Sequence, residues 1–332
     1  MDLHTSSFFQ KIRPRRNRRT EAIRKLVRET HLAPSQLVLP LFVQEGRIRR
    51  TAIDSLPGCF RLTPDLILEE AREAQALGIP AIALFPVISS ALKDRTASES
   101  ANDNGLLPQT VRLIKEALPD MAVITDVAMD PYSTDGHDGL VEDGKIMNDA
   151  TLDILARMAV AQARAGADFV APSDMMDGRV AFIRQALDEN GFEETGILSY
   201  AVKYASAFYG PFREALDSAP RAGDKKTYQM DPANAREAER EALLDEKEGA
   251  DIVMVKPALP YLDIVSRVRA AVKIPVAAYQ VSGEYAMLKA GAAQGWLDEN
   301  AALLETLTAI RRAGADILFT YAAKTAAKLL QT

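Results

Sequence analysis

Two lysines stand at the ends of apolar segments and have the chemistry of amine nucleophiles. In IVMVKPALPYLDI, Lys256 ends an all-apolar run, and Pro257 stops any further strand pairing. Lys203 lies in a second segment of this kind, SYAVKYASAFYGPFR. Two ammonium groups in one dry cavity repel each other, so one of them loses its proton more easily and can attack a ketone. The pair predicts Schiff-base chemistry, whereas Lys256 alone could equally extend from the strand end to bulk water.

An acidic loop, DVAMDPYSTDGHDG, runs from Asp126 to Gly139 and brings four aspartates close to His137. Carboxylates favour hard ions such as magnesium. Cys59 is the only cysteine, so a thiolate zinc cage and an intrachain disulfide are both excluded. The loop is therefore either a site for a hard cation or an acidic wall for a substrate amine.

Cationic residues follow the Lys203 segment and suggest an anionic substrate group. Arg213 ends YGPFR, and Lys225 and Lys226 precede Gln229 in AGDKKTYQM. Arginine binds a carboxylate in bidentate fashion and lysine acts as a point charge. A run such as KK is more often a solvated loop, but a substrate with a ketone and a carboxylate would use both sets of residues.

Eight short apolar segments alternate with amphipathic ones and predict a parallel α/β architecture. Three of them follow a helix that ends in glycine, as in RAGADFVAPS, EGADIVMVKP and RAGADILFTY. Helices are expected from Thr63 to Gly78 and from Asp231 to Gly249, each opened by a capping residue and a proline. Eight units predict a closed (β/α)8 barrel, and the alternative is an open doubly wound sheet, which lacks its glycine-rich phosphate motif here. The strands are expected at 37–43, 81–86, 122–127, 169–172, 196–201, 252–256, 275–282 and 317–321.

In a barrel of this type the chemistry lies at the carboxyl ends of the strands. The polar residues that fall there should converge on one mouth. They are Asp126, Ser173, Lys203, Lys256, Ser282 and Tyr321.

The chain has 332 residues and a net charge of -6, yet its first residues are strongly basic. We expect residues 1–35 to form a basic N-terminal arm that makes an oligomer contact, and residues 36–332 to form the barrel catalytic domain. An arm that binds nucleic acid is the alternative, but it has no interleaved aromatic residues and adjoins an acidic body. No apolar run approaches a membrane span, and no signal peptide is visible, so we expect a cytoplasmic protein with no membrane partner.

Taken together, MVKPALPYLDIV, SYAVKYASAFYGPFR, APSDMMDGR, YQVSGEYAM and the acidic loop closely resemble the porphobilinogen synthase (5-aminolaevulinate dehydratase) family. The resemblance extends from the arm to the last strand. It implies a lyase of haem and other tetrapyrrole biosynthesis that joins two molecules of 5-aminolaevulinate into porphobilinogen and releases two waters. It also implies a TIM barrel whose arm wraps a neighbouring subunit, in a hexamer or an octamer.

The resemblance also implies roles for individual residues. Lys256 matches the lysine that forms a Schiff base with the P-side substrate, and Lys203 matches the lysine of the A-side substrate. The GPFR-to-YQM region resembles the active-site lid. The matching substrate ligands are Ser282 and Tyr321 on the P side and Arg213, Lys225 and Gln229 on the A side. Asp126 and Ser173 fall where the family lines the A-side amine pocket, and Tyr209 is a further expected substrate-binding residue.

The sequence departs from the zinc-dependent members of the family. Ala128, Asp130 and Asp138 stand where those members have cysteines, so we expect a non-zinc enzyme without an organic cofactor. Asp130 and Asp138 either position substrate amines or hold magnesium or a monovalent cation loosely. Glu241 matches the ligand of a separate, allosteric magnesium, although a single glutamate on a charged helix is more often a solvated residue.

Two other functions remain open at this point. A class I aldolase is also a lysine-dependent barrel enzyme, but it needs only one essential lysine. A binding protein whose arm contacts RNA would instead show salt-sensitive binding that is lost with residues 1–30.

Overall fold

The structure is a computed structural model that describes residues 12–216 and 220–331. The chain divides into two compact units, Met1–His31 and Leu32–Thr332. The described part of the first unit contains a 3-10 helix, η1 (Pro14–Arg18), and a short helix, α2 (Glu21–Leu26). Neither of these helices buries any of its residues.

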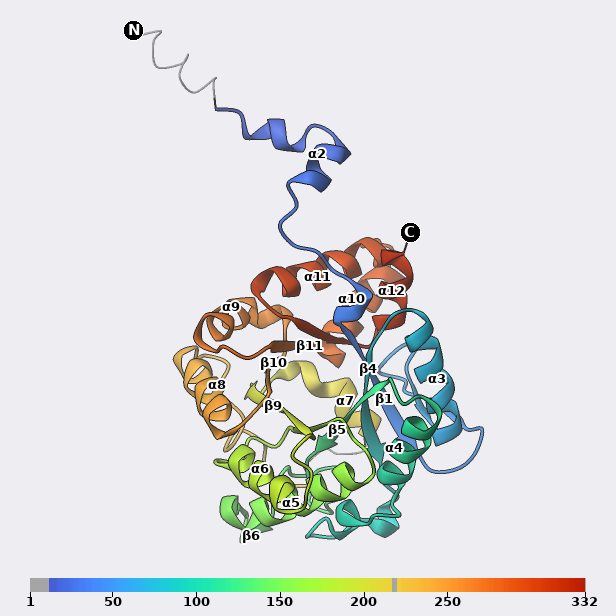
Figure 1. Ribbon diagram of the computed structural model, residues 1–332, viewed down its shortest axis with the longest axis vertical. Coiled ribbons are helices and arrows are strands. Elements are labelled where there is room, and N and C mark those ends of the chain that lie inside the picture. Colours follow the sequence, from blue (N-terminus) through green and yellow to red (C-terminus); the bar gives the residue numbers. More distant parts are fainter. Residues whose placement is uncertain (1–11, 217–219, 332) are drawn as a thin grey trace. The chain divides into compact units, whose positions relative to one another are not determined.

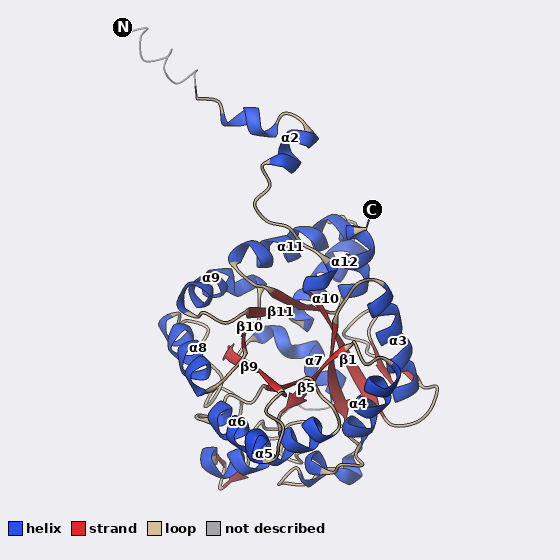
Figure 2. Cartoon of the chain, viewed as in Figure 1, coloured by secondary structure: helices blue, strands red, loops and turns tan. Residues whose placement is uncertain are grey.

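The second unit is a closed barrel of eight parallel strands, as the sequence predicts (Figures 1 and 2). Neighbouring strands pair in chain order, and the last strand pairs with the first through Leu37–Leu318 and Val38–Phe319. An open doubly wound sheet is thereby excluded. The strands are β1 Leu37–Gln44, β4 Ala81–Val87, β5 Ala122–Val127, β8 Phe169–Pro172, β9 Gly196–Lys203, β10 Ile252–Lys256, β11 Val276–Gln280 and β12 Ile317–Thr320.

Helices surround the barrel (Figure 2), and α3 begins at Pro64 as expected. The predicted start at Asp231 is wrong, because the Asp231 carboxylate accepts from the Ala233 N–H in a turn and the helix begins only at Arg236. None of the helices in 12–216 and 220–331 is long and apolar enough to cross a membrane. The helices are α3 Pro64–Ala76, α4 Leu106–Ala117, α5 Asn148–Arg164, α6 Arg179–Glu189, α7 Gly210–Leu216, α8 Arg236–Glu248, α9 Leu262–Ala271, α10 Ser282–Ala293, α11 Glu299–Ala313 and α12 Ala323–Leu330.

Short elements that periodicity did not predict fill the connections. The acidic loop leads into a two-stranded hairpin, β6 (Val141–Glu142) with β7 (Lys145–Ile146). Another short pair, β2 (Arg50–Ala52) and β3 (Phe60–Leu62), extends β1. The remaining 3-10 helices are η2 Pro34–Gln36, η3 Ser90–Leu92, η4 Ser98–Ala101, η5 Ala207–Tyr209 and η6 Leu259–Tyr261.

The strand register decides how the two lysines meet. Lys256 and Lys203 are aligned partners on the adjacent strands β10 and β9, and each is the last residue of its strand. Both side chains are buried although each carries an amine. Ser282, which was expected to end the seventh strand, is instead the first residue of α10, because β11 stops at Gln280.

Candidate active site

The Lys256 amine lies in an aromatic cage. Its Nζ is 4.8 Å from the ring centres of Phe212 and Tyr279, 5.0 Å from Tyr200 and 5.4 Å from Tyr209. Burial lowers the pKa of Lys256, and the nearby Lys203 lowers it further, to about 7. About half of this amine is therefore neutral at pH 7, as a nucleophile requires.

Lys203 has a different environment, which is polar and anionic. Its Nζ donates to the carbonyl oxygen of Ser173 and lies 3.3 Å from Oδ2 of Asp138. The other oxygen of Asp138 lies 2.6 Å from Nζ of Lys225. Burial would raise the pKa of Asp138, but Lys203 and Lys225 outweigh it and lower the pKa to about 2. Asp138 is therefore an anion shared by two ammonium groups.

Lys225 also reaches Asp130, at 3.2 Å, so its ammonium bridges two carboxylates of the acidic loop. Burial would lower the pKa of Lys225, but the attraction of Asp130 and Asp138 raises it overall. In contrast, the pKa of Asp130 is raised, chiefly by burial. In this structure Lys225 is thus engaged by two aspartates, and its expected contact with a substrate carboxylate stays a prediction.

Asp126 is buried near the end of β5, where the sequence placed it. Its Oδ1 has no hydrogen-bond partner within the described part of the chain. Burial raises the pKa of Asp126, and repulsion from Asp130 raises it further, to about 7. A carboxyl with this pKa, attracted by the charges of both lysines, can take up or release a proton near neutrality.

The predicted P-side ligands lie on the Lys256 side of the mouth. The Tyr321 hydroxyl lies 3.1 Å from that of Tyr279, a member of the Lys256 cage. The Ser282 hydroxyl accepts from the backbone N–H of Phe212 at 3.1 Å, which ties α10 to α7. The hydroxyl of Tyr209 donates to the Lys256 carbonyl oxygen at 3.1 Å. The structure therefore brings Ser282, Tyr321 and Tyr209 together with Lys256.

The predicted A-side ligands come from two places, α7 for Arg213 and the connection before α8 for Lys225 and Gln229. Gln229 is buried, and its Oε1 has no partner among the residues that the structure describes. Its backbone N–H donates to the Lys225 carbonyl oxygen at 2.9 Å, so one turn presents both residues. Arg213 lies half-buried on α7. Lys226 is exposed and pairs loosely with Asp224 at 3.7 Å, which fits the solvated alternative for this lysine.

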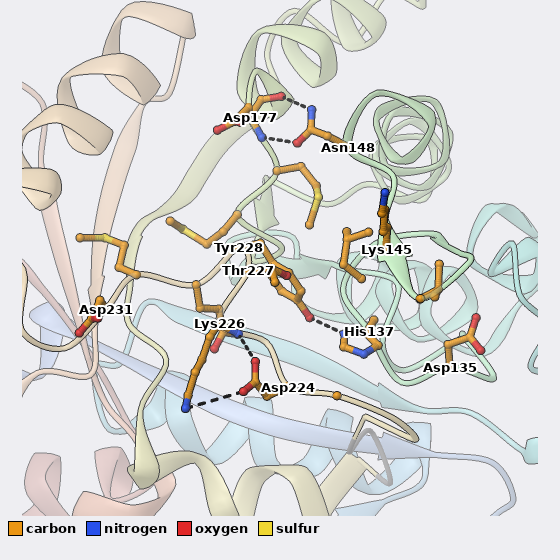
Figure 3. Close-up of a pocket in the computed structure, with 18 of the residues that line it drawn as sticks. Asp135, His137, Lys145, Asn148, Asp177, Asp224, Lys226, Thr227, Tyr228 and Asp231 are labelled. Atoms are coloured by element: carbon orange, nitrogen blue, oxygen red, sulfur yellow. Dashed lines mark hydrogen bonds and ion pairs between the residues drawn. The ribbon is translucent and has the colours of Figure 1, made fainter.

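A cavity of about 950 Å³ lies beside residues 221–231, and Gln229 is among the residues that line it (Figure 3). It is lined by this segment, the β6–β7 hairpin and α8, and it contains neither Lys203 nor Lys256. Glu241 lines it, and burial raises the pKa of that carboxyl. The two lysines lie apart from this lining, beside the buried carboxylates of Asp126 and Asp138.

The residues do not fit a catalytic metal. Lys225 already occupies the position between Asp130 and Asp138 that a cation would take. In the described ranges, no group of three His, Cys, Asp or Glu side chains has the spacing to hold an ion. The ionic roles predicted for Asp130, Asp138 and Glu241 stay predictions, and no chemical step is derived from a metal.

The family model for delta-aminolevulinic acid dehydratase matches residues 11–329. The chain belongs to the delta-aminolevulinic acid dehydratase family. Delta-aminolevulinic acid is 5-aminolaevulinate in its acid form, so this chain is a hydro-lyase that makes porphobilinogen. Family membership also decides against aldol cleavage.

Relatives in this dehydratase family are similar over nearly the whole chain. The chloroplastic dehydratase of Oryza sativa subsp. japonica is 57% identical over 96% of this chain and 75% of its own length. The chloroplastic dehydratase 1 of Arabidopsis thaliana is 57% identical over 96% of this chain and 74% of its own length. The Toxoplasma gondii enzyme, solved in complex with the reaction product porphobilinogen, has a TM-score of 0.94 and 54% identity, and covers 96% of this chain and 91% of that chain.

The expectation of a cytoplasmic protein is wrong by the same comparison. The similar dehydratases of Oryza sativa subsp. japonica and Arabidopsis thaliana are named as chloroplastic and not as cytoplasmic. The sequence argument relied on an apolar signal segment, and a plastid address carries no such segment.

The sequence prediction missed the aromatic cage. Phe212 stands within the quoted GPFR motif, and Tyr200 and Tyr279 lie on β9 and β11. Side chains alternate between the interior and the exterior of a barrel along each strand, so the positions of Tyr200 and Tyr279 could have been assigned to the interior. Aromatic rings that face the interior near a lysine at a strand end desolvate its amine.

Proposed function

We propose that this dehydratase works through two lysine Schiff bases, with Lys256 as the first nucleophile. The observation that carries the proposal is the aromatic burial of Lys256 beside an aligned second lysine. The lowered pKa supplies a neutral amine, which attacks the ketone of the first 5-aminolaevulinate and releases one water.

Lys203 forms the second imine in this scheme. It begins as an ammonium held by Ser173 and Asp138, and must give up a proton before it attacks the second ketone with release of the second water. Asp126, whose pKa is about 7, is the acceptor we assign to that proton. The two substrates are then joined by a carbon–carbon and a carbon–nitrogen bond, and both lysines are released from the product as free amines. The net reaction therefore consumes two molecules of 5-aminolaevulinate and releases two waters.

The surrounding residues bind the two substrates. Ser282 and Tyr321 receive the carboxylate of the first, because both lie around the Lys256 cage. Arg213 and Gln229 receive the carboxylate of the second, with Lys225 joining them if it leaves Asp130. Water is kept from the imines by α7, whose Phe212 covers Lys256.

Borohydride reduction tests this mechanism. Added with 5-aminolaevulinate, it should fix substrate mass on a peptide that contains Lys256, and Lys203→Met should still be labelled while making no pyrrole. Absence of label on Lys256 in folded, substrate-saturated protein contradicts the mechanism. We also propose activity without zinc, because carboxylates and lysines fill the loop; zinc that is stoichiometric and lost together with activity on chelation would refute this.

We further propose that residues 1–31 make a contact between subunits in a hexamer or an octamer. The support is exposure: Leu26 on α2 is 84% exposed, and this arm also carries Ile12 at 65%. Native mass spectrometry of the full chain and of a chain that starts at Leu32 tests this directly. An unchanged assembly after the truncation contradicts it.

A further inference from the structure

His137 joins the acidic loop to the segment 221–230, which is called the lid segment below. One ring nitrogen, Nε2, lies 2.8 Å from the carbonyl oxygen of Ala222, and the other, Nδ1, lies 3.1 Å from the hydroxyl of Tyr228 (Figure 3). The same hydroxyl accepts from the backbone N–H of Asp138 at 3.3 Å. Three contacts between the two segments thus converge on one imidazole and one phenol.

The partners fix the direction of these hydrogen bonds. A carbonyl oxygen only accepts, so Nε2 of His137 carries the proton toward Ala222. In the neutral ring Nδ1 then accepts from the Tyr228 hydroxyl. Burial raises the pKa of Tyr228, and the nearby charge of Asp138 raises it further, so the hydroxyl keeps its proton and donates. Every polar group of the clasp, defined as the side chains of His137 and Tyr228, therefore has a complementary partner.

Tyr228 of the clasp and the two proposed substrate ligands of the lid segment belong to one stretch of chain. Tyr228, His137 and Gln229 line the cavity of Figure 3, whereas Lys225 does not line it and is buried against Asp138 and Asp130. The turn that ends in the Gln229-to-Lys225 backbone hydrogen bond spans Tyr228. Contacts that hold Tyr228 therefore act on the same turn that carries Lys225 and Gln229.

Asp138 connects the clasp to the chemistry. Its backbone N–H is held by Tyr228, and its carboxylate holds Lys203 and Lys225. Loss of the phenol hydroxyl would free this backbone and, with it, the anion that orients the second lysine. Other hydrogen bonds also hold the lid segment, including one from the Met230 N–H to the Lys203 carbonyl oxygen at 3.0 Å. The clasp therefore adds to the stability of the closed position and is not its only support.

We propose that His137 and Tyr228 are positioning residues, which hold the lid segment closed so that Lys225 and Gln229 meet the second 5-aminolaevulinate. The inference deepens the proposed function and rests on it for the identity of the bound ligand. Neither residue reacts. Their effect is on the apparent affinity for the second substrate, not on imine formation by the first.

Tyr228→Phe removes only the hydroxyl, and it is the first test. We expect the KM for 5-aminolaevulinate to rise about tenfold with a smaller change in kcat, the effect of one to two lost hydrogen bonds. Borohydride trapping of the first substrate on Lys256 should stay at the wild-type level. In the folded variant, trypsin should cut after the exposed Lys226 faster than in the wild type. His137→Asn should behave alike, and it provides the same readouts if Tyr228→Phe does not fold.

Tyr285→Phe is the matched control, because its buried phenol also donates to a backbone carbonyl, that of Pro57 at 2.9 Å, far from the lid segment in sequence. The double variant of the clasp should be no worse than the poorer single variant, since the two residues act as one unit. Unchanged KM and unchanged lid cleavage in a folded variant would overturn the proposal, as would an equal effect in the control. The cleavage rate needs no imine, so a failure of the Schiff-base mechanism would be seen separately, as unlabelled Lys256 in the wild type.

Discussion

The pH dependence of imine formation at Lys256 tests the central physical claim about this enzyme. An ordinary lysine with a pKa of about 10.5 is neutral in only about 0.03% of molecules at pH 7. Burial in the aromatic cage, reinforced by Lys203, brings the pKa of Lys256 to about 7, so about half is neutral. Burial and the neighbouring Lys203 together therefore increase the concentration of the reactive amine on the order of a thousandfold.

The assay is the initial rate of borohydride trapping of 5-aminolaevulinate, measured from pH 5 to pH 9 and followed by mass spectrometry of the Lys256 peptide. Trapping should increase with pH, with a midpoint near 7, and level off above it. In Lys203→Met the midpoint should move upward, because a repelling positive charge is gone and Lys256 keeps its proton more firmly.

Two results would refute this reasoning. A wild-type midpoint above pH 9 would mean that the cage is hydrated and does not desolvate the amine. A downward shift in Lys203→Met would mean that the second lysine does not act on Lys256 as a like charge. The variant Lys324→Met serves as a control, since it removes a lysine of α12 that pairs with Glu70 and Glu73 on α3.

Three further changes have expected outcomes. Lys256→Met should abolish activity yet raise the thermal unfolding midpoint at pH 7, by an amount corresponding to up to a few kcal/mol. The pKa of Lys256 is lower in the folded state than in the unfolded state, so this lysine opposes folding below about pH 10 and most strongly below pH 7. A fall in the midpoint would contradict this. Asp138→Asn should lower the free energy of unfolding by about 3–5 kcal/mol in urea titrations, since it leaves two buried ammonium groups without their shared anion. In the wild type the Asp138 carboxylate stabilises the fold above about pH 4 and ceases to do so as the pH falls through 2. The free energies of unfolding of wild type and variant should therefore become equal in acid. Gly283→Ala should cost about 1–3 kcal/mol and reduce kcat/KM, because a Cβ there would lie 2.6 Å from the carbonyl oxygen of Phe208 in η5, directly before α7. Gly295→Ala is the comparison, because a Cβ there meets nothing within 4 Å but the φ of +72° strains the backbone.

Much of the fold was predictable from local sequence. Eight apolar runs with glycine-terminated helices before some of them predicted the barrel, and all eight strands lie where these runs do. The error at Asp231 has a local cause as well: an aspartate followed by proline opens a helix or a turn, and the choice depends on what the turn packs against.

The sequence by itself determined which groups are present at the mouth of the barrel. Strand-end positions follow from periodicity, so the order of the apolar runs is enough to assign Lys203, Lys256, Asp126 and Tyr321 to one rim. The same rule could not place residues of the connections, such as Lys225 and Gln229, because loop paths are set by long-range contacts and not by a repeating pattern.

Only the tertiary structure decided what each group is able to do. Burial by Phe212 and Tyr279 favours the neutral Lys256 amine, while Asp138, brought up from the acidic loop, faces Lys203 with an anion. The two lysines are chemically the same residue, and the pKa of Lys256 depends on which atoms surround it, at distances of a few ångströms, through desolvation and charge. Those neighbours come from strands, loops and a helix that are far apart in the chain, and folding alone brings them together.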